Sequence, residues 1–251
     1  MHPFLKHPTV LAFAHRGDQL TGPENTLSAF EGAAKLGFKY LETDVHATAD
    51  GKLVAFHDQV LDRVSNTTGL ISEKHYDEIK QIRIGLSEKI PLLEDLLGYF
   101  PNIYFNIDPK SNDTVEPLIN IIKKTNSTHR VCIGSFSDKR LIHIRNALPD
   151  VCTSMGPREV FLTKAINLGF FNRRIKANCI QIPHYWNGIE LVNENFVKKM
   201  KNFGWQVHVW TINSASEMNQ LLDIGVNGIM SDDLLLLKNV LNSRGQWSES
   251  Y

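Results

Sequence analysis

Short apolar runs and amphipathic segments alternate along the whole chain. Runs such as 10–15 and 40–45 have the length of buried β-strands and end in polar residues. Between them, apolar residues recur at helical spacing over 24–36, and a glycine follows at the position where helices commonly stop. The pattern therefore predicts strands and helices that follow one another in turn.

Eight strands can be assigned in this way, each followed by a helix. The other six expected strands are 103–107, 131–135, 151–155, 179–182, 205–211 and 228–231. The expected helices after the first are 91–100, 113–124, 138–148, 157–168, 194–203, 214–224 and 234–241. Eight parallel strands with eight helices close into a (β/α)8 TIM barrel, and 251 residues suit one such domain over 1–251. An open doubly wound sheet is the alternative, but the sequence has no Gly-x-Gly-x-x-Gly turn.

Two segments fall outside this α/β alternation. Residues 59–90 are polar and mixed, which predicts a small insertion after the second strand unit. Inserted loops on that face of a barrel usually shape the entry of substrate. Residues 242–251 are polar, and we expect them to form a frayed tail.

A hairpin signal follows the second strand. Asp50-Gly51 favours a two-residue turn, in which residues whose numbers sum to 101 would face each other. Asp44 would then pair with His57, and such neighbours have Cβ atoms about 5 Å apart. The hairpin is therefore expected to carry His57 back beside Glu42 and Asp44.

Polar side chains gather at the predicted strand ends. The carboxyl ends of barrel strands meet at one face, where barrel enzymes keep their active sites. The residues expected there are His15, Arg16, Glu42, Asp44, His57, Asp108 and Lys110, with Ser135, Trp210, Ser231 and Asp232 from later strands. This set predicts one site.

Glu42 and Asp44 point to the same side of their strand, because side chains alternate with period two. Two such carboxylates stay ionised together most easily when a divalent cation lies between them. Asp108 offers a third oxygen ligand, and all-oxygen ligation suits Ca²⁺ or Mg²⁺. The alternative is a buried salt network in which Glu42 pairs with Arg16 or Lys110.

His15 and His57 are the candidate proton-transfer pair. Cleavage of a phosphodiester needs one group that takes a proton and one that gives a proton, and histidine does either near neutral pH. The alternative is a core histidine bonded to a backbone carbonyl. Arg16 and Lys110 are expected to hold the phosphate, although basic residues also serve in surface ion pairs.

Phe136 and Trp210 are candidates for packing the apolar part of a substrate, with ordinary core packing as the alternative. The cysteines, Cys132, Cys152 and Cys179, lie in apolar runs and are expected to be buried free thiols in a reducing compartment.

Net charge and hydropathy limit the classes of binding partner that we expect. Lys+Arg and Asp+Glu both number 27, so the zero formal charge gives no case for nucleic acid or an anionic membrane. No run approaches the roughly 20 apolar residues of a transmembrane helix, and the first residues do not resemble a signal peptide. We expect a cytoplasmic protein with a small-molecule substrate, and the sequence predicts no oligomeric state.

These residues form a pattern that resembles the glycerophosphodiester phosphodiesterases, which are phospholipase C-like barrels of the cytoplasmic bacterial type. The matching motifs are His-Arg-Gly at 15–17, Pro-Glu-Asn-Thr at 23–26, Glu-Thr-Asp-Val at 42–45, Asp-Gly at 50–51, His-Asp at 57–58, Asn-Ile-Asp-Pro-Lys at 106–110, Ser-Phe at 135–136, Trp-Thr at 210–211 and Ser-Asp at 231–232.

The resemblance implies a barrel that hydrolyses glycerophosphodiesters to sn-glycerol 3-phosphate and an alcohol. It implies His15 and His57 as general acid and base, and Arg16 and Lys110 as phosphate contacts. It also implies one divalent cation, Ca²⁺ or Mg²⁺, bound by Glu42, Asp44 and Asp108. Two alternatives stay open, which are lysophospholipase D action on lysolipids and a phosphate-ester-binding barrel without catalysis.

Three positions depart from the family pattern. Asp108-Pro109 stands where Glu-x-Lys is usual, so the third acid is about one methylene shorter. Asn227 stands where an acid is common, and Asp233 where a proline is common.

Overall fold

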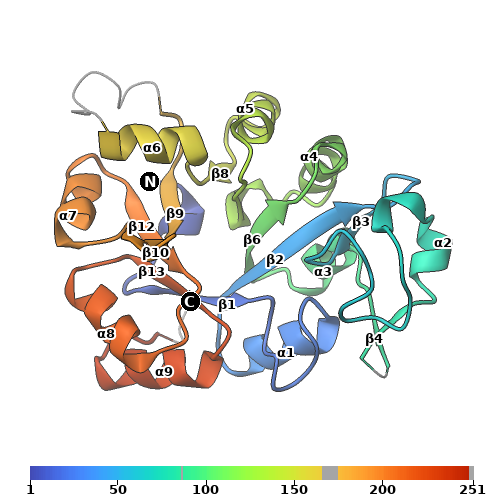
Figure 1. Cartoon of the computed structure of the whole chain (residues 1–251), viewed down its shortest axis with the longest axis horizontal. Helices are drawn as coiled ribbons and strands as arrows, with labels where there is room; N and C mark the ends of the chain where they lie inside the picture. Colours follow the sequence, from blue (N-terminus) through green and yellow to red (C-terminus); the bar gives the residue numbers. More distant parts are fainter. Residues whose placement is uncertain (86, 166–174, 249–251) are drawn as a thin grey trace.

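The computed structural model describes residues 1–85, 87–165 and 175–248. Eight parallel strands line up in the order β8-β7-β6-β2-β1-β13-β12-β9. Their bounds are β1 Leu11–His15, β2 Tyr40–Ala47, β6 Tyr104–Pro109, β7 Val131–Ile133, β8 Cys152–Thr153, β9 Cys179–Pro183, β12 Gln206–Trp210 and β13 Gly228–Ser231. They form a nearly closed ring with helices around it (Figure 1), so the predicted (β/α)8 barrel is confirmed.

A helix follows each barrel strand. The bounds are α1 Leu27–Lys35, α3 Leu93–Tyr99, α4 Val115–Lys124, α5 Asp138–Ala147, α6 Pro157–Ala165, α7 Glu194–Asn202, α8 Ala215–Asp223 and α9 Leu234–Ser243. Helix α4 illustrates why they form, because it buries an i, i+3, i+4, i+7 stripe of Val115, Leu118, Ile119 and Ile122. The part of the predicted helix 157–168 beyond residue 165 lies outside the described residues.

Helix α1 begins later than its apolar pattern predicts. Thr26 has an extended backbone, and its hydroxyl accepts a hydrogen bond from the Ala29 amide, so it caps the helix. Glu24 and Asn25 therefore lie before the helix, which leaves their side chains at the mouth of the barrel.

The opposite end of the barrel is closed by the N-terminal segment. Phe4, in the short 3-10 helix Pro3–Leu5, is fully buried against Phe13, Tyr40 and Tyr104. The Tyr40 hydroxyl also donates to the Phe4 carbonyl at 3.0 Å. Because these rings lie at or near the starts of β1, β2 and β6, they fill the barrel below the site.

Residues 59–90 form the predicted insertion. They contain the 3-10 helix Ile71–Glu73, α2 Tyr76–Ile79, β4 Arg83–Ile84 and β5 Glu88–Lys89. Their apolar side chains join Val54 and Phe56 in a separate cluster, whose other members are Leu61, Ile71, Ile79, Ile82, Ile84 and Ile90. Figure 1 shows this unit beside β2 and β3 (Leu53–Ala55), at the edge of the barrel.

The predicted register of the hairpin is wrong by one residue. β2 and β3 pair Val45 with Ala55, so facing residues sum to 100, and Asp44 lies opposite Phe56. The connection has three residues, because the Gly51 amide bonds to the Thr48 carbonyl and Gly51 takes the left-handed backbone. A turn closed by a left-handed glycine is the usual three-residue hairpin, and Asp-Gly serves it as well as the two-residue form.

The tail that was predicted to be frayed is packed against the barrel in its described residues. Arg244 forms an ion pair with Asp223 at 2.7 Å, and Trp247 packs edge-on against Phe38 with ring centroids 5.0 Å apart. The Trp247 indole supplies apolar area that the mostly polar composition of this segment does not reveal. Residues 249–251 of this segment lie outside the described residues.

In the described ranges, no helix has both the length and the apolarity needed to cross a membrane.

Candidate active site

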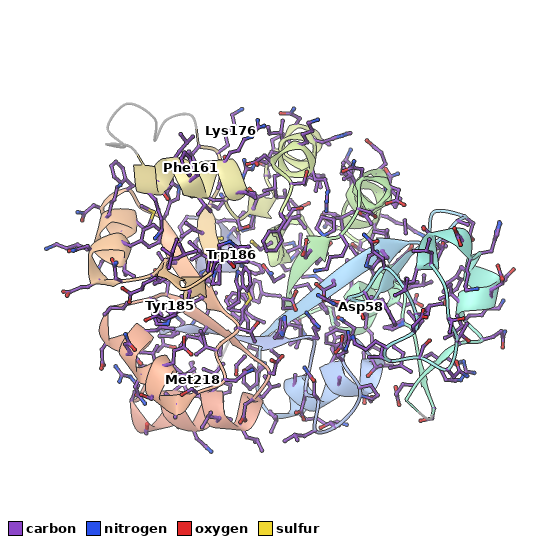
Figure 2. The ribbon with its side chains drawn as sticks, in the orientation of Figure 1. Asp58, Phe161, Lys176, Tyr185, Trp186 and Met218 are labelled. Atoms are coloured by element: carbon purple, nitrogen blue, oxygen red, sulfur yellow. The ribbon has the colours of Figure 1, made fainter. Side chains whose placement is uncertain are left out.

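A cavity of about 600 Å³ opens at the carboxyl ends of the barrel strands. All nine predicted site residues line it, namely His15, Arg16, Glu42, Asp44, His57, Asp108, Lys110, Phe136 and Trp210. Figure 2 shows Trp186 over the middle of the ring and Asp58 on the side of the insertion. The structure therefore brings the predicted residues together, while their roles stay predictions.

A tight turn after β1 presents Arg16. Arg16 has a left-handed backbone, and its amide donates to the Glu42 carbonyl at 3.0 Å. Gly17 follows with φ of 87°, and a Cβ there would lie 2.7 Å from the Ala29 backbone. Glycine is required at this close approach, because only it fits both the backbone angle and the space.

The two cations of the site converge on one carboxylate. Lys110 Nζ lies 2.6 Å from Asp44 Oδ1 and 2.9 Å from Asp108 Oδ2, and Arg16 Nε lies 3.1 Å from Asp44 Oδ2. Burial alone would raise the pKa of Asp44, but Lys110 and Arg16 hold it below its usual value. The predicted alternative of a salt network thus forms around Asp44 and not around Glu42.

Glu42 is the buried acid of the site that lacks such a partner. Its Oε2 atom is buried and, within the described residues, has no hydrogen-bond partner. His15 Nε2 lies 3.7 Å away. Burial and the Asp44 charge raise the pKa of Glu42 to about 8. Glu42 is therefore the place where the site lacks positive charge.

Both histidines are held in the same way. His15 Nδ1 donates to Asp232 and His57 Nδ1 donates to Asp58, each at 2.6 Å. A carboxylate at Nδ1 fixes the ring and its tautomer, which leaves Nε2 for proton transfer. Burial would lower the pKa of His15, but Glu42 and Asp232 together raise it above the ordinary value.

The carboxylates behind the histidines are themselves held. Asp232 accepts from Asn213 at 2.8 Å and from Gln19 at 3.1 Å. Asp58 accepts from Arg63 Nε at 2.6 Å, and this hydrogen bond is the main cause that lowers the pKa of Asp58 to about 2. Both acids therefore stay ionised beside their histidines at neutral pH.

Sequence reasoning missed four supporting residues. A chain of ion pairs connects the hairpin to the mouth of the barrel, and its members are His57, Asp58, Arg63, Glu24, Arg16 and Asp44. Asp58, Arg63 and Glu24 were not assigned roles, and Asp232 was expected at the strand ends without a role, although Glu24, Asp58 and Asp232 lie within motifs. His46 fits the alternative reading of a core histidine, because its Nε2 lies 3.0 Å from the His57 carbonyl.

An apolar wall faces the charged half of the cavity. Phe136 is 62% exposed and meets Trp210 edge-on at 5.8 Å between ring centroids. Phe161 on α6 is 68% exposed, and Trp186 on the strand β10 (Tyr185–Trp186) is 52% exposed. Phe136, Phe161 and Trp186 are thus rim residues and not core residues, so they are available to an apolar ligand.

The closed parallel barrel, with ionisable residues at the carboxyl ends of its strands, defines a TIM-barrel enzyme. The sequence profile of the Glycerophosphoryl diester phosphodiesterase family matches residues 15–236. The chain therefore belongs to this family of phosphodiesterases.

Individual proteins give the same result. A Mycobacterium tuberculosis protein named "Probable glycerophosphodiester phosphodiesterase 2" is 36% identical, and the match covers 97% of this chain and 95% of that protein. Human "Lysophospholipase D GDPD1" is 26% identical, over 95% and 92%. An Oleispira antarctica phosphodiesterase, solved with the product sn-glycerol-3-phosphate, has a TM-score of 0.79 at 22% identity, over 93% and 97%.

Two departures from the family pattern have structural roles here. The Asp233 carboxylate accepts from the Leu236 amide and caps α9 in place of a proline. The Asn227 side chain accepts from the Val207 amide at 3.0 Å, which ties the start of β13 to β12.

The pairing of Asp232 with His15 predicts a measurable shift. Replacing Asp232 with Asn removes one of the two groups that raise the pKa of His15, so this pKa should fall. NMR titration of the His15 ring protons measures it. Asp58→Asn is the matched control, since it alters the acid behind the other histidine. A His15 pKa that is the same in Asp232→Asn as in the unmodified chain would show that the pair is not electrostatically coupled.

Proposed function

We propose that this chain hydrolyses glycerophosphodiesters to sn-glycerol 3-phosphate and an alcohol, with His15 and His57 as the proton-transfer pair. The observation that carries this proposal is the matched pair of histidines, each held at Nδ1 by a carboxylate at 2.6 Å, in one cavity with two cations. Family membership and the product bound to the Oleispira relative support the same reaction.

The two histidines have different surroundings, which suggests a division of labour. His15 is buried beside Glu42 and has a raised pKa, so it holds its proton and is suited to give it to the leaving alcohol oxygen. His57 lies nearer to solvent and takes a proton from the water that attacks the phosphorus, while the alcohol leaves with the proton from His15. Arg16 and Lys110 bind the phosphate oxygens and offset their charge.

The charges of the site support a divalent cation. Among the described residues, Lys110 pairs with Asp44 and Asp108, and Arg16 pairs with Asp44 and Glu24, so neither cation forms an ion pair with Glu42. Burial and the Asp44 charge raise the pKa of Glu42 to about 8, and a bound cation would supply the positive charge that this acid lacks.

Three carboxylates offer oxygen ligands to such an ion. Glu42 offers a buried oxygen that has no hydrogen-bond partner in the described ranges, and Asp44 and Asp108 lie side by side on β2 and β6. We propose these three as the ligands, and an all-oxygen set of this kind suits Ca²⁺ or Mg²⁺. A cation bound there supplies Lewis-acid stabilisation of the charge that develops on the phosphate.

Removing either histidine should remove the chemistry. We expect His15→Ala and His57→Ala to lower kcat on glycerophosphocholine by on the order of 10²-fold or more, measured by release of glycerol 3-phosphate. His143→Ala is the control, because His143 is exposed and pairs with Glu116 on the outside of the barrel. Near-normal rates would remove that histidine from the mechanism, and binding without turnover of any diester would favour the non-catalytic barrel.

Chelation tests the cation separately. EDTA should abolish turnover, and added Ca²⁺ or Mg²⁺ should restore it. Glu42→Gln should raise the cation concentration needed for half-maximal rate, since it removes one charged ligand. Undiminished turnover by metal-free protein would contradict the proposed role.

The apolar wall favours a second candidate function, which is lysophospholipase D action. A lysolipid carries the same phosphodiester together with one acyl chain, and Phe136, Phe161 and Trp186 present exposed rings beside the phosphate-binding residues. The human relative named a lysophospholipase D is consistent with this candidate. A small glycerophosphodiester makes no use of such a wall.

Comparison of two substrates decides between these candidates. If the wall holds an acyl chain, Phe161→Ala and Trp186→Ala should each lower kcat/KM for lysophosphatidylcholine about tenfold, from the lost burial of one ring. The values for glycerophosphocholine should stay unchanged. Ile142→Ala, which removes an exposed apolar side chain of α5, is the control. Equal losses on both substrates, or none on lysophosphatidylcholine, would exclude an acyl site at this wall.

A further inference from the structure

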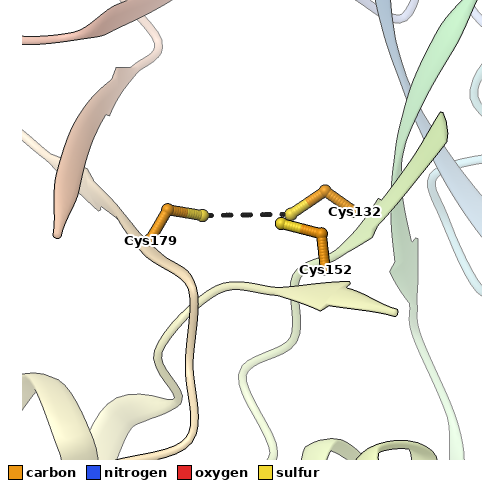
Figure 3. Close-up of side chains that lie close together, drawn as sticks. All are labelled: Cys132, Cys152 and Cys179. Atoms are coloured by element: carbon orange, nitrogen blue, oxygen red, sulfur yellow. Dashed lines mark hydrogen bonds between the residues drawn. The ribbon is translucent and has the colours of Figure 1, made fainter. Parts of the chain in front are cut away.

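The three cysteines of the chain meet inside the barrel. Cys132 on β7, Cys152 on β8 and Cys179 on β9 are fully buried free thiols, as predicted. Their sulfur atoms all lie within 4.8 Å of one another, and those of Cys132 and Cys179 are 3.9 Å apart (Figure 3). In the described part of the chain, no other set of three His, Cys, Asp or Glu side chains is this close.

The 3.9 Å between the sulfurs of Cys132 and Cys179 matches the spacing of metal-bound thiolates, and the remaining pairs lie within 4.8 Å. A metal–sulfur bond of about 2.3 Å places the sulfurs of a trigonal or tetrahedral centre about 3.8–4.0 Å apart. A disulfide needs about 2.05 Å, so the side chains are not posed for one. A cation can therefore be accommodated with little movement of the three side chains.

The cysteine cluster spans the gap between β8 and β9, where the pairing of neighbouring barrel strands is weakest. β8 and β9 are the two ends of the strand order, and within the described residues one isolated bridge, Ser154 with Cys179, connects them. Two further backbone bonds flank it, from Met155 to Cys179 and from Asn178 to Thr153, both at 2.9 Å. A cation held by thiols from β7, β8 and β9 would close this seam.

The surroundings of the cluster lower the pKa of one of its thiols, and a second cavity opens nearby. His208 on β12 interacts with Cys179, and hydrogen bonds from Cys132 and Cys152 together with His208 hold the pKa of Cys179 well below its usual value. A second cavity of about 560 Å³ opens beside this end of the barrel, and its lining includes His2, His129 and Asn178. Asn178 directly precedes Cys179, so this cavity reaches the neighbourhood of the thiols.

We propose that Cys132, Cys152 and Cys179 bind one soft cation of the Zn²⁺, Cd²⁺ or Cu⁺ type through their three thiolates. Thiolates select such cations over Mg²⁺ and Ca²⁺, which prefer oxygen. Each thiol that binds loses its proton to the buffer, so the affinity falls as the pH falls. This site is separate from the carboxylates at the mouth of the barrel, and its role is to staple the seam.

Titration of the folded, reduced protein with Cd²⁺ tests the proposal. The ultraviolet thiolate-to-cadmium charge-transfer band should grow to one equivalent per chain, and every thiolate signal must come from these three residues. The same ion at about 100 times its Kd should raise Tm by about 5 °C or more. Mg²⁺ at the same concentration should give no band.

Variants locate the site. Cys132→Ala and Cys152→Ala should each weaken Cd²⁺ binding at least tenfold, whereas Ser154→Ala, a change at the same seam that keeps all three thiols, should leave it unchanged. Circular dichroism identifies which cysteine variants are folded, and bound Cd²⁺ should protect the thiols of the unmodified chain from alkylation. Absence of the band in the folded protein, or its appearance only after unfolding in urea, would overturn the proposal.

Discussion

The mouth of the barrel is organised by negative charge that is buried and incompletely matched. Asp44 satisfies its own burial by taking both Arg16 and Lys110, at 3.1 and 2.6 Å. Glu42, two residues earlier on the same strand, is left with an oxygen that has no partner among the described residues. A buried ion without a counter-charge is costly, so the site is built to attract positive charge and protons. His15 lies next to this deficit and holds its proton more firmly as a result.

The rest of the scaffold keeps this imbalance in place. Parallel pairing of β2 with β6 puts Asp44 beside Asp108. The insertion contributes Arg63, which bonds both Asp58 and Glu24, so the hairpin that carries His57 is tied to the Arg16 turn. At the other end, the Phe4 ring fills the barrel, which keeps the charged layer at one face. The packed aromatic rings at one end of the barrel therefore stabilise the fold, while the incompletely matched charge at the other end serves the site.

Much of this architecture can be predicted from local sequence, because strand ends of a barrel converge whatever the details of packing. That rule alone places His15, Glu42 and Asp108 in one cavity. The hairpin register could not be predicted, since Asp-Gly suits both two- and three-residue loops and the choice depends on the backbone that Gly51 adopts. His57 reaches the cavity even so, because it follows the end of β3 and its position is set by tertiary contacts.

Contacts between distant segments also could not be predicted from the sequence. The apolar rim combines Phe136 after β7, Phe161 on α6 and Trp186 on β10, and no periodicity relates them. The choice of Asp44 over Glu42 as the partner of Arg16 depends on side-chain directions that spacing does not encode. The cysteines were recognised as buried, but their meeting required the order of β7, β8 and β9 around the barrel.

The most direct test of the central claim is to identify which bond breaks. The protein is incubated with glycerophosphocholine and Ca²⁺ or Mg²⁺, and the products are followed by phosphorus NMR. The account predicts conversion to sn-glycerol 3-phosphate with release of choline. Formation of phosphocholine and glycerol, or no conversion with either cation, would contradict it.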